Sequence, residues 1–281
     1  YQKMRALIIY LVISAVFIGC TPILSIDAST QNVYHFSDTD KNISLLDISE
    51  TFGTYDGSFV LYDNNLDSWK IYDLEEATKR IPPESTYKIY DALLGLESGI
   101  ITPEHSSMTW NGDAFPFPSW EADQDLNSAM QNSVNWYFQA IDSQLGINRV
   151  QEFLNKIEYG NQTTSSNLDL YWSDFSLKIS PLEQVTLLKK FNTNEFHLNS
   201  QNVFSVKNAI KIASTPNGNF YGKTGTGRVN GQDINGWFIG YVETSDNSYY
   251  FATNIQSDSN ATGKKAFEIT SDILKKLHIW N

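Results

Sequence analysis

A serine and a lysine three positions apart, Ser85 and Lys88, have the side chains and the spacing for covalent chemistry. On the first turn of a helix, this spacing places the hydroxyl and the amine on one face, within reach of each other. The amine can then deprotonate the serine, which becomes a nucleophile. A free lysine has a pKa of about 10.4, so this role requires burial, a neighbouring cation or modification of the amine. Taken alone, the pair is more typical of a serine N-cap beside a solvated lysine.

The second candidate is the glycine-rich segment 221–227, which reads YGKTGTG. In a strand that lines a cleft, Gly225 would let the backbone of a substrate approach closely. Lys223 and the two threonines, Thr224 and Thr226, would bind a carboxylate. The ordinary alternative is a glycine-rich strand end or turn. The segment is not a P-loop, because the preceding glycine that a P-loop requires is not at the right spacing.

Two further short motifs lie between these segments: Ser133 and Asn135 form a Ser-x-Asn pair, and Tyr159 begins a Tyr-Gly-Asn run. Each also has an ordinary interpretation, a polar patch within a helix for the first and a C-cap glycine for the second. In combination, the order Ser-x-x-Lys, Ser-x-Asn, Tyr-Gly-Asn and Lys-Thr-Gly is typical of serine penicillin-recognising enzymes. None of the four histidines has a nucleophile or metal-ligand spacing around it, which disfavours a Ser-His-Asp hydrolase.

The hydrophobic pattern predicts the elements that must position these residues. The predicted strands are 57–62, 69–72, 236–243 and 249–255. Residues 85–156 have a helical pattern, and further helices are predicted at 181–191, with Pro181 in the first turn, and at about 262–277. Strands on both sides of a helical insertion predict an α+β fold, in which an antiparallel sheet is flanked by helices and accompanied by a helical subdomain.

Composition excludes several classes of protein. The chain has 281 residues, and its 20 Lys and Arg against 32 Asp and Glu give a formal charge of −12. Such a chain offers no basic surface for phosphate backbones, so nucleic acid is not an expected partner. The single cysteine, Cys20, has no partner for an internal disulfide, and no cluster has the spacing of a structural zinc site. No metal is expected.

An uncharged, mostly apolar stretch covers residues 6–26, which is close to the roughly 20 residues that a transmembrane helix needs. We therefore expect a transmembrane helix at 1–26, a polar tether at 27–50 and a folded domain at 51–281. Lys3 and Arg5 precede the stretch, so the positive-inside rule places the folded domain outside the cell membrane. Two alternatives are a cleaved signal peptide starting at Met4 and a lipoprotein signal acylated at Cys20. The first residue, Tyr1, favours instead a fragment of a longer membrane protein.

Longer phrases of the sequence resemble the class D β-lactamase fold, and within it the extracellular sensor domains of the BlaR/MecR β-lactam receptors. The resemblance covers about residues 53–277. It is carried by the phrases STYKIY at 85–90, MQNSVNWY at 130–137, YGN at 159–161, SLKIS at 176–180 and GWFIGY at 236–241, and by Trp120 followed by QDLN at 124–127.

The resemblance implies a role for each motif. Ser85 would be the nucleophile that a β-lactam acylates, and Lys88 would be its base, able in these families to carry CO2 as a carbamate. Ser133 would relay a proton to the β-lactam nitrogen. Lys223 and Thr224, beside Gly225, would hold the carboxylate of the drug. Three more site residues are implied. The amide of Thr226, with that of Ser85, would form the oxyanion hole, Trp172 would support the carbamate, and Tyr159 would bind the substrate.

Asn135 separates a receptor from an enzyme in this resemblance, because class D β-lactamases usually have an apolar residue there. CO2 adds only to a neutral amine, and a polar amide beside Lys88 would help to expel it. Without the carbamate no base activates water, so the acyl adduct would persist. The sequence thus predicts a membrane-anchored β-lactam sensor whose partners are the drug and the rest of its receptor chain. The alternatives are a class D β-lactamase, a cell-wall transpeptidase or carboxypeptidase, and an adhesion module in which Ser85 is unreactive.

Overall fold

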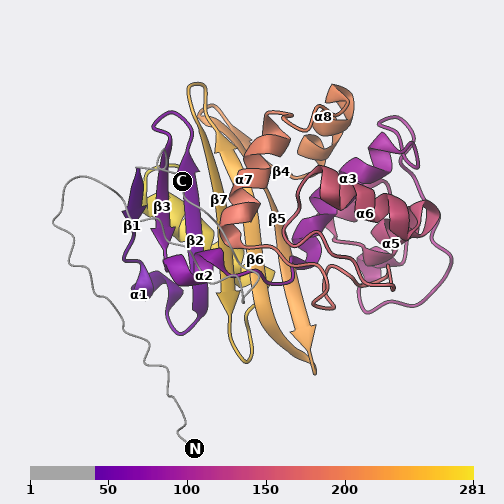
Figure 1. Cartoon of the computed structure of the whole chain (residues 1–281), viewed down its shortest axis with the longest axis horizontal. Coiled ribbons are helices and arrows are strands. Elements are labelled where there is room, and N and C mark those ends of the chain that lie inside the picture. Colours follow the sequence, from indigo (N-terminus) through magenta and orange to yellow (C-terminus); the bar gives the residue numbers. More distant parts are fainter. Residues whose placement is uncertain (1–41) are drawn as a thin grey trace, which may run out of the picture.

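The structure, a computed structural model, describes residues 42–281. Within them, seven strands form one sheet in the order β1-β3-β2-β7-β6-β5-β4 (Figure 1). The strands are β1 (Ile43–Leu45), β2 (Asp56–Asp63), β3 (Ser68–Tyr72), β4 (Lys211–Thr215), β5 (Gly218–Val229), β6 (Gln232–Glu243) and β7 (Ser248–Gln256). All four predicted strands are present, as β2, β3, β6 and β7, and the sheet has three more, β1, β4 and β5.

The sheet is mixed, which corrects the prediction of an antiparallel sheet. Five of the strand pairs run antiparallel, as in β2 against β7 and β6 against β7, but β1 pairs with β3 in parallel. The parallel strand lies at 43–45, inside the stretch that the sequence analysis assigned to a tether at 27–50. Leu46, directly after β1, also donates its N–H to the carbonyl of Ile71 at 2.8 Å. The folded part therefore begins earlier than predicted.

The helices of the described residues fall into two groups, one that flanks the sheet and one that contains the helical subdomain and the short 3-10 helices. The flanking helices are α1 (Ser49–Phe52), α2 (Leu74–Thr78), α7 (Pro181–Asn192) and α9 (Gly263–Lys276). The others are the short 3-10 helices η2 (Glu84–Tyr87) and η3 (Pro118–Trp120), with α3 (Lys88–Glu97), α4 (Leu126–Gln131), α5 (Asn135–Leu145), α6 (Ile147–Lys156) and α8 (Ser200–Ala209). The predicted helical block, the helix at Pro181 and the last helix are confirmed.

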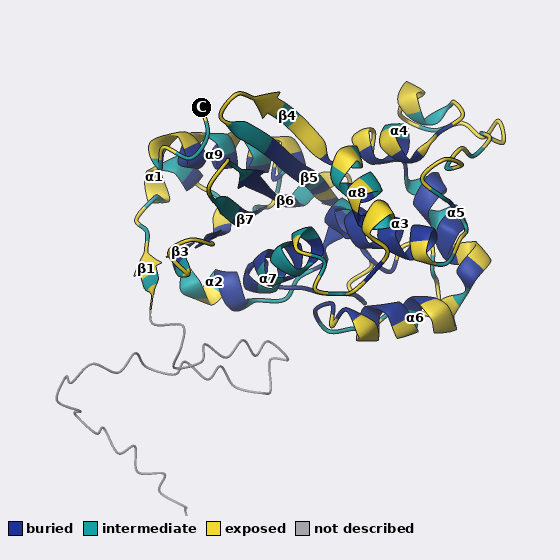
Figure 2. Cartoon of the chain, turned by 90° about the horizontal axis from the view of Figure 1, so that it is seen from above, coloured by how far each residue is buried: buried dark blue, intermediate teal, exposed yellow. Residues whose placement is uncertain are grey.

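Helices cover both faces of the sheet, and Figure 2 shows α7 and α9 on opposite sides of it. On one face, Phe59, Phe238 and Phe251 pack with α1 and α9 in one apolar cluster. On the other face, α2, α7 and the helical subdomain share a second and larger cluster. Because both faces are covered, β2 reads as the continuous apolar run 59–62 instead of alternating polar and apolar residues.

Local sequence signals fix the start of α7, which leads the chain back from the subdomain to the sheet. The Ser180 hydroxyl accepts the N–H of Glu183 at 3.1 Å, and the Glu183 carboxylate accepts the N–H of Ser180 at 3.1 Å. This is a capping box, with Pro181 in the first turn where its missing N–H costs nothing. Glu183 also receives a bidentate pair of hydrogen bonds from Arg80, at 2.9 Å each.

The predicted transmembrane helix at 1–26 and most of the predicted tether lie outside the described residues. Among residues 42–281, no helix has the length and the apolar character needed to cross a membrane.

Candidate functional site

Ser85 and Lys88 lie at the junction of η2 and α3, near the boundary between the sheet and the helical subdomain. The Lys88 amine donates a hydrogen bond to Ser85 Oγ at 2.8 Å, so the predicted pair is formed. Lys88 is completely buried, although its side chain is charged in its ordinary state. The interpretation of a solvated lysine beside a capping serine is therefore wrong for this pair.

Ser133 and Asn135 meet the same amine from the turn between α4 and α5. Lys88 Nζ donates to Asn135 Oδ1 at 2.5 Å, to Ser133 Oγ at 3.0 Å and to the Ser133 carbonyl at 3.1 Å. Ser133 has a φ of 53°, a left-handed conformation that is uncommon outside glycine and often occurs at functional sites. The two side chains lie at the start of a helix, not in the interior of one.

Lys223 completes this polar cluster from β5. Its amine donates to Ser133 Oγ at 3.1 Å and to the carbonyl of Thr224 at 2.9 Å. Ser133 therefore bridges two buried amines, that of Lys88 and that of Lys223. This places a proton-carrying hydroxyl between the base beside Ser85 and the lysine at the edge of the sheet.

Burial lowers the pKa of both lysines, and the charge of Lys223 lowers that of Lys88 further. Burial, followed by the nearby charge of Lys223, lowers the pKa of Lys88 well below its ordinary value, while Asp91 and Glu84 act in the opposite direction. Burial lowers the pKa of Lys223 to about 7. A neutral amine at Lys88 meets the requirement for a base that the sequence analysis stated.

Glycine at position 225 lets β5 pack directly against the nucleophile. A Cβ at Gly225 would lie 3.2 Å from the Ser85 backbone nitrogen and 3.2 Å from Glu84 Cβ. Thr226 follows, and its hydroxyl accepts the N–H of Gly263 at the start of α9, at 2.9 Å. Glycine at 225 thus lets the strand pack tightly against Ser85, which is a more specific reason for this residue than the approach of a substrate.

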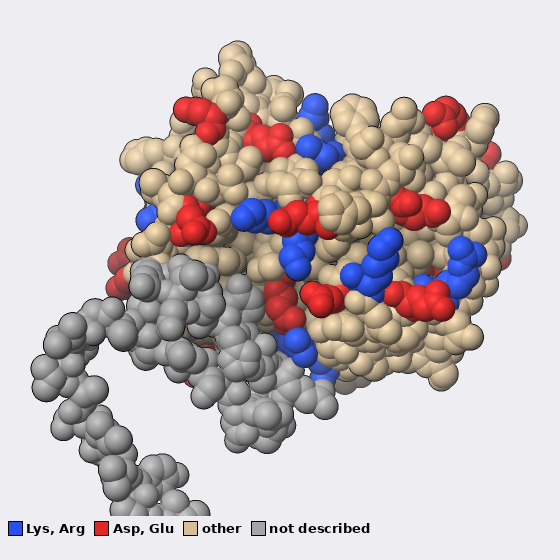
Figure 3. All heavy atoms as spheres, turned by 45° about the horizontal axis from the view of Figure 1, so that its top comes forward, with Lys and Arg blue, Asp and Glu red and all other residues tan. Residues whose placement is uncertain are grey.

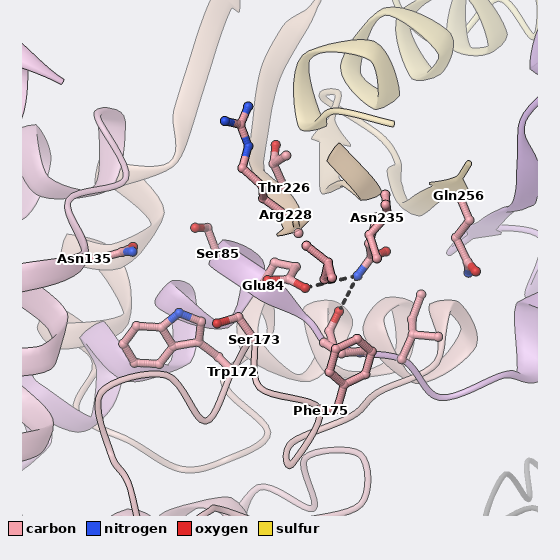
Figure 4. Close-up of a pocket in the computed structure, with 15 residues that line it drawn as sticks. Glu84, Ser85, Asn135, Trp172, Ser173, Phe175, Thr226, Arg228, Asn235 and Gln256 are labelled. Atoms are coloured by element: carbon pink, nitrogen blue, oxygen red, sulfur yellow. Dashed lines mark hydrogen bonds between the residues drawn. The ribbon is translucent and has the colours of Figure 1, made fainter. Parts of the chain in front are cut away.

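A pocket of about 290 Å³ opens beside Ser85. Figure 4 shows Asn135 and Trp172 on one side of Ser85, with Glu84 and Asn235 on the other. The remaining residues that line this pocket are Ile81, Pro82, Ser173, Phe175, Thr226, Gly227, Arg228, Val229, Ile234 and Gln256. A second cavity, of about 430 Å³, lies along β5 and is lined by Lys223 and Thr224 among others. The predicted ligand residues of β5 therefore divide between two neighbouring cavities.

Trp172 lies where the resemblance implied, because its ring centroid is 6.0 Å from Lys88 Nζ. Tyr159 does not, and this corrects the expectation that it contacts a ligand. Its side chain is fully buried and packs edge-on against Tyr87 and Tyr90, at centroid distances of 5.2 and 5.3 Å. It belongs to the aromatic core behind Ser85.

The rest of the Tyr-Gly-Asn run supports the segment that follows Trp172. A Cβ at Gly160 would lie 1.9 Å from the Lys178 carbonyl oxygen, so only glycine fits there. Asn161 accepts the N–H of Lys178 at 2.9 Å and donates to the carbonyl of Ser176 at 2.7 Å. Gly160 is therefore not a helix C-cap, since α6 ends at Lys156.

The sequence analysis missed Glu84 and Asn235, which form the polar wall of the first pocket. Asn235 donates to Glu84 Oε1 at 3.3 Å and to the carbonyl of Pro82 at 3.1 Å, and Glu84 has a φ of 53°. Burial raises the pKa of Glu84 to about 8, against the hydrogen bond from Asn235 and the charge of Lys88. The only signal in the sequence was the position of Glu84 directly before Ser85.

Replacing Glu84 by glutamine is expected to stabilise the protein at pH 8 more than at pH 5. The folded protein keeps the Glu84 proton up to about pH 8, whereas the unfolded chain releases it at an ordinary value near 4.5. The contribution of Glu84 to the free energy of unfolding is therefore fully present at low pH, and it is lost as the pH rises through about 8. At about 1.4 kcal/mol per pKa unit, we expect Glu84→Gln to gain about 2–4 kcal/mol at pH 8.

Urea unfolding of both proteins at pH 5 and pH 8 measures this difference. Because the glutamine side-chain oxygen can still accept from Asn235, the substitution removes the charge and keeps the contact. An equal effect of the substitution at both pH values would contradict the prediction.

The surroundings of Lys88 fit a free amine better than a carbamate. Asn135 Oδ1 and the Ser133 carbonyl can only accept, and both receive a hydrogen bond from Nζ. A carbamate nitrogen keeps one N–H and so cannot serve both. The anionic oxygens of a carbamate would also be repelled by the Asn135 side-chain oxygen, which lies 2.5 Å from Nζ. These contacts favour the free amine as the base beside Ser85.

On the face that Figure 3 shows, basic and acidic side chains alternate across the described residues, without a continuous basic area.

A nucleophilic serine, a buried amine beside it, a bridging serine and a second lysine on a strand edge together define a serine acyl-transfer site. The family model described as the penicillin binding protein transpeptidase domain matches residues 49–275. The fold and the site thus place the chain in a class whose members react covalently through a serine.

Individual relatives narrow this class. Regulatory protein BlaR1 of Bacillus licheniformis is 45% identical over 277 residues, which are 98% of this chain and 45% of the relative. The solved C-terminal domain of the Bacillus licheniformis BlaR penicillin-receptor is 46% identical, with a TM-score of 0.83 over 85% of this chain and 98% of that domain. A probable β-lactamase of Bacillus subtilis, YbxI, is 37% identical over 235 residues, which are 84% of this chain and 86% of the relative.

The chain belongs to the family of penicillin-binding protein transpeptidase domains and, within it, to the C-terminal domains of BlaR/MecR-type receptors. It spans about half the length of the curated receptors that it matches, 45% in one case and 47% in another.

Proposed function

We propose that this chain is the β-lactam-binding part of a membrane sensor, in which a penicillin or cephalosporin acylates Ser85 and the adduct persists as the signal. The observation that carries the proposal is the set of hydrogen bonds around Lys88 Nζ, above all the one to Asn135 Oδ1 at 2.5 Å. A buried amine supports acylation, and a fixed amide oxygen beside it disfavours the second, hydrolytic half of the reaction.

Acylation follows from the contacts of Ser85. As Ser85 Oγ attacks the carbonyl carbon of the β-lactam, its proton passes to Lys88 Nζ, which lies 2.8 Å away. The lactam C–N bond breaks, and the nitrogen takes a proton from Ser133, which Lys88 replenishes across 3.0 Å. Lys223 and Thr224 would bind the drug's carboxylate, and the amides of Ser85 and Thr226 would stabilise the oxyanion.

Acylation leaves Lys88 as a neutral amine, because the proton that it took from Ser85 passes on to Ser133. Persistence of the adduct then depends on whether this amine takes up a proton from solvent. Hydrolysis requires a base that takes a proton from water, and a lysine acts as that base only while it is neutral. The side-chain oxygen of Asn135 and the backbone carbonyl of Ser133 only accept hydrogen bonds, so they favour the protonated form of the amine. An ammonium in this position cannot activate water, and the ester of Ser85 survives.

The setting of the domain in the cell belongs to the same proposal. The apolar stretch at 6–26 would anchor the chain in the cell membrane, with the domain at 51–281 outside and the rest of the receptor chain as its signalling partner. The likeness to BlaR1, a regulatory protein, supports this assignment. Since the chain spans only part of that relative, transduction would need residues beyond this sequence.

Intact-mass spectrometry of the chain after mixing with excess benzylpenicillin, followed for hours after the free drug is removed, tests the function. A sensor shows an adduct of one drug per chain that persists for hours, and Ser85→Ala shows none. The second candidate, a class D β-lactamase, is favoured by the likeness to YbxI. It would lose the adduct within seconds while drug is hydrolysed. If the wild type forms no adduct, both functions fail.

A further inference from the structure

The residue directly before Ser85 has a backbone conformation that needs support. Glu84 has a φ of 53°, in the left-handed region that contact between Cβ and the backbone disfavours in residues other than glycine. Such a residue keeps its conformation only where the surrounding structure holds it, and residues of this kind cluster at active sites. One supporting contact is made by the Glu84 N–H, which donates to the carbonyl of Trp172 at 2.9 Å.

Asn235 on β6 supplies further contacts through its side-chain amide. Its nitrogen donates to the carbonyl of Pro82 at 3.1 Å and to Glu84 Oε1 at 3.3 Å, the two hydrogen bonds drawn as dashed lines in Figure 4. Trp237, two residues further along the strand, donates its indole N–H to the same carbonyl at 2.8 Å. Asn235 and Glu84 are both buried, so one amide ties together the two ends of segment 82–84 away from bulk water.

The orientation of the Asn235 amide is itself fixed by the sheet. Asn254 on β7 donates to Asn235 Oδ1 at 2.8 Å, and Gln256 donates to Asn254 Oδ1 at 3.0 Å. Because the oxygen of the Asn235 amide is held in this way, its nitrogen must face Pro82 and Glu84. The three amides therefore form a chain of hydrogen bonds that runs across β7 and β6 and ends on segment 82–84.

Glycines of β5 hold the same segment from the other side. Gly227 lies opposite Asn235 in the strand register, and a Cβ there would lie 2.4 Å from Glu84 Oε1. A Cβ at Gly225 would lie 3.2 Å from the backbone nitrogen of Ser85. The Glu84 carboxyl and the Ser85 amide thus both pack on β5, and Asn235 fixes the carboxyl in the space that Gly227 leaves.

The conformation of Glu84 decides where the N–H of Ser85 points. That N–H belongs to the peptide group between the two residues, so a change to an ordinary conformation at Glu84 would rotate the group. Under the proposed function, the same N–H stabilises the oxyanion while Ser85 Oγ gives its proton to Lys88 Nζ, 2.8 Å away. Both steps need the geometry that a fixed segment 82–84 provides, because small displacements of reacting groups slow a reaction strongly.

We propose that Asn235, held in place by Asn254, is a positioning residue for the acylation of Ser85. It acts through Glu84, whose left-handed conformation it maintains, and through the carbonyl of Pro82. The inference rests on the proposed sensor function and deepens it, since it assigns a role in the acylation step to a residue of the pocket wall.

Four substitutions test this role. Asn235→Ala removes the donor to Pro82 and Glu84. Glu84→Gly places at position 84 the residue that adopts a positive φ without support, so Asn235→Ala should matter less in that background. Asn254→Ala leaves both hydrogen bonds of Asn235 in place and frees its amide to rotate. Asn155→Ala, at an exposed asparagine on α6, is the matched control.

The experiment follows adduct formation by the full chain with benzylpenicillin by intact mass, at several drug concentrations. We expect Asn235→Ala to slow acylation at saturating drug by about ten- to a hundredfold, the range that a misplaced reacting group causes. The drug concentration that gives half of the maximal rate should not change. Asn254→Ala should slow acylation less, and Asn155→Ala should react as the wild type does.

The Glu84→Gly background separates positioning from a general loss of stability. There, Asn235→Ala should slow acylation by a factor at least about threefold smaller than in the wild-type background, a coupling of the size that residues in contact show. Urea unfolding shows that each variant is folded. If Asn235→Ala does not fold, Asn254→Ala in the two backgrounds makes the same comparison.

Two results would overturn the proposal. An equal slowing in both backgrounds would show that Asn235 does not act through the conformation of Glu84. A higher half-saturating concentration with an unchanged maximal rate would make Asn235 a drug-binding residue instead. Failure of the sensor function is distinguishable from either result, because the wild type itself would then form no adduct or lose it within seconds.

Discussion

Replacing Lys88 by methionine is expected to slow the acylation of Ser85 by about 10²–10⁴-fold, the usual contribution of a positioned general base. Methionine keeps the length and the buried apolar stem but cannot accept a proton. Lys88 Nζ is the group that contacts Ser85 Oγ, at 2.8 Å, and Ser133 Oγ, at 3.0 Å, so both proton transfers pass through it. The measurement is the rate of adduct formation with benzylpenicillin at several drug concentrations, followed by intact mass.

The pH dependence of acylation identifies the cause of that loss. Because burial and the charge of Lys223 lower the pKa of Lys88, the wild-type rate should rise with pH and reach its plateau well below 10.5, the ordinary value for lysine. The rate for Lys88→Met should lack this rise. Lys276→Met, at an exposed lysine on α9, is the control and should react as the wild type does. A Lys88→Met variant that acylates at the wild-type rate would remove Lys88 from the mechanism.

The sequence predicted the centre of this site well because its motifs are local. Ser85 and Lys88 share one turn, and Ser133 and Asn135 share another, so their spacing alone brings the functional groups together. That these two turns lie next to β5 was predicted from the order of the motifs and from the resemblance to a known family. The structure supplies its physical basis, which is the glycine at 225 that lets β5 pack on the Ser85 backbone.

The features that the sequence analysis missed all depend on contacts between distant segments. Glu84 becomes a buried acid only because Asn235 and the glycines of β5 close over it. Asp91 and Asp142 occupy ordinary polar positions in the sequences of two helices, and both are fully buried in the structure, in which α3 packs on α5. Tyr159 was predicted to contact a ligand from its motif, and only the packing of Tyr87 and Tyr90 shows that it is core.

Dependence on a distant segment also explains why β1, the first strand of the sheet, was not predicted. The segment 43–45 is short and largely exposed, and it has no alternation of polar and apolar residues long enough to predict a strand. They pair in parallel because β3 offers an open edge, where Ile43 lies opposite Trp69 and Leu45 opposite Ile71. An edge strand of this kind is selected by its partner and not by its own pattern.

Replacing Asn135 by valine is expected to shorten the life of the acyl adduct by about ten- to a hundredfold, the range that corresponds to a hydrogen bond to a charged group. The Asn135 oxygen is the nearest acceptor to Lys88 Nζ, at 2.5 Å, and the lysine to which it is bound is completely buried. Its removal lowers the pKa of Lys88 further, since the ammonium loses a partner that the neutral amine needs less. A neutral amine can then accept a proton from water and release the drug.

The opposite substitution gives the test its control. Asn135→Asp has nearly the same size, and its carboxylate would hold the ammonium more firmly, so its adduct should live at least as long as that of the wild type. Intact-mass spectrometry after removal of free benzylpenicillin gives the lifetimes of all three proteins, and released penicilloic acid confirms hydrolysis. If valine and aspartate changed the lifetime in the same direction, the amide oxygen would be acting through packing. Changes in opposite directions would establish that the charge state of one buried amine, that of Lys88, decides whether the protein retains the acyl adduct or hydrolyses it.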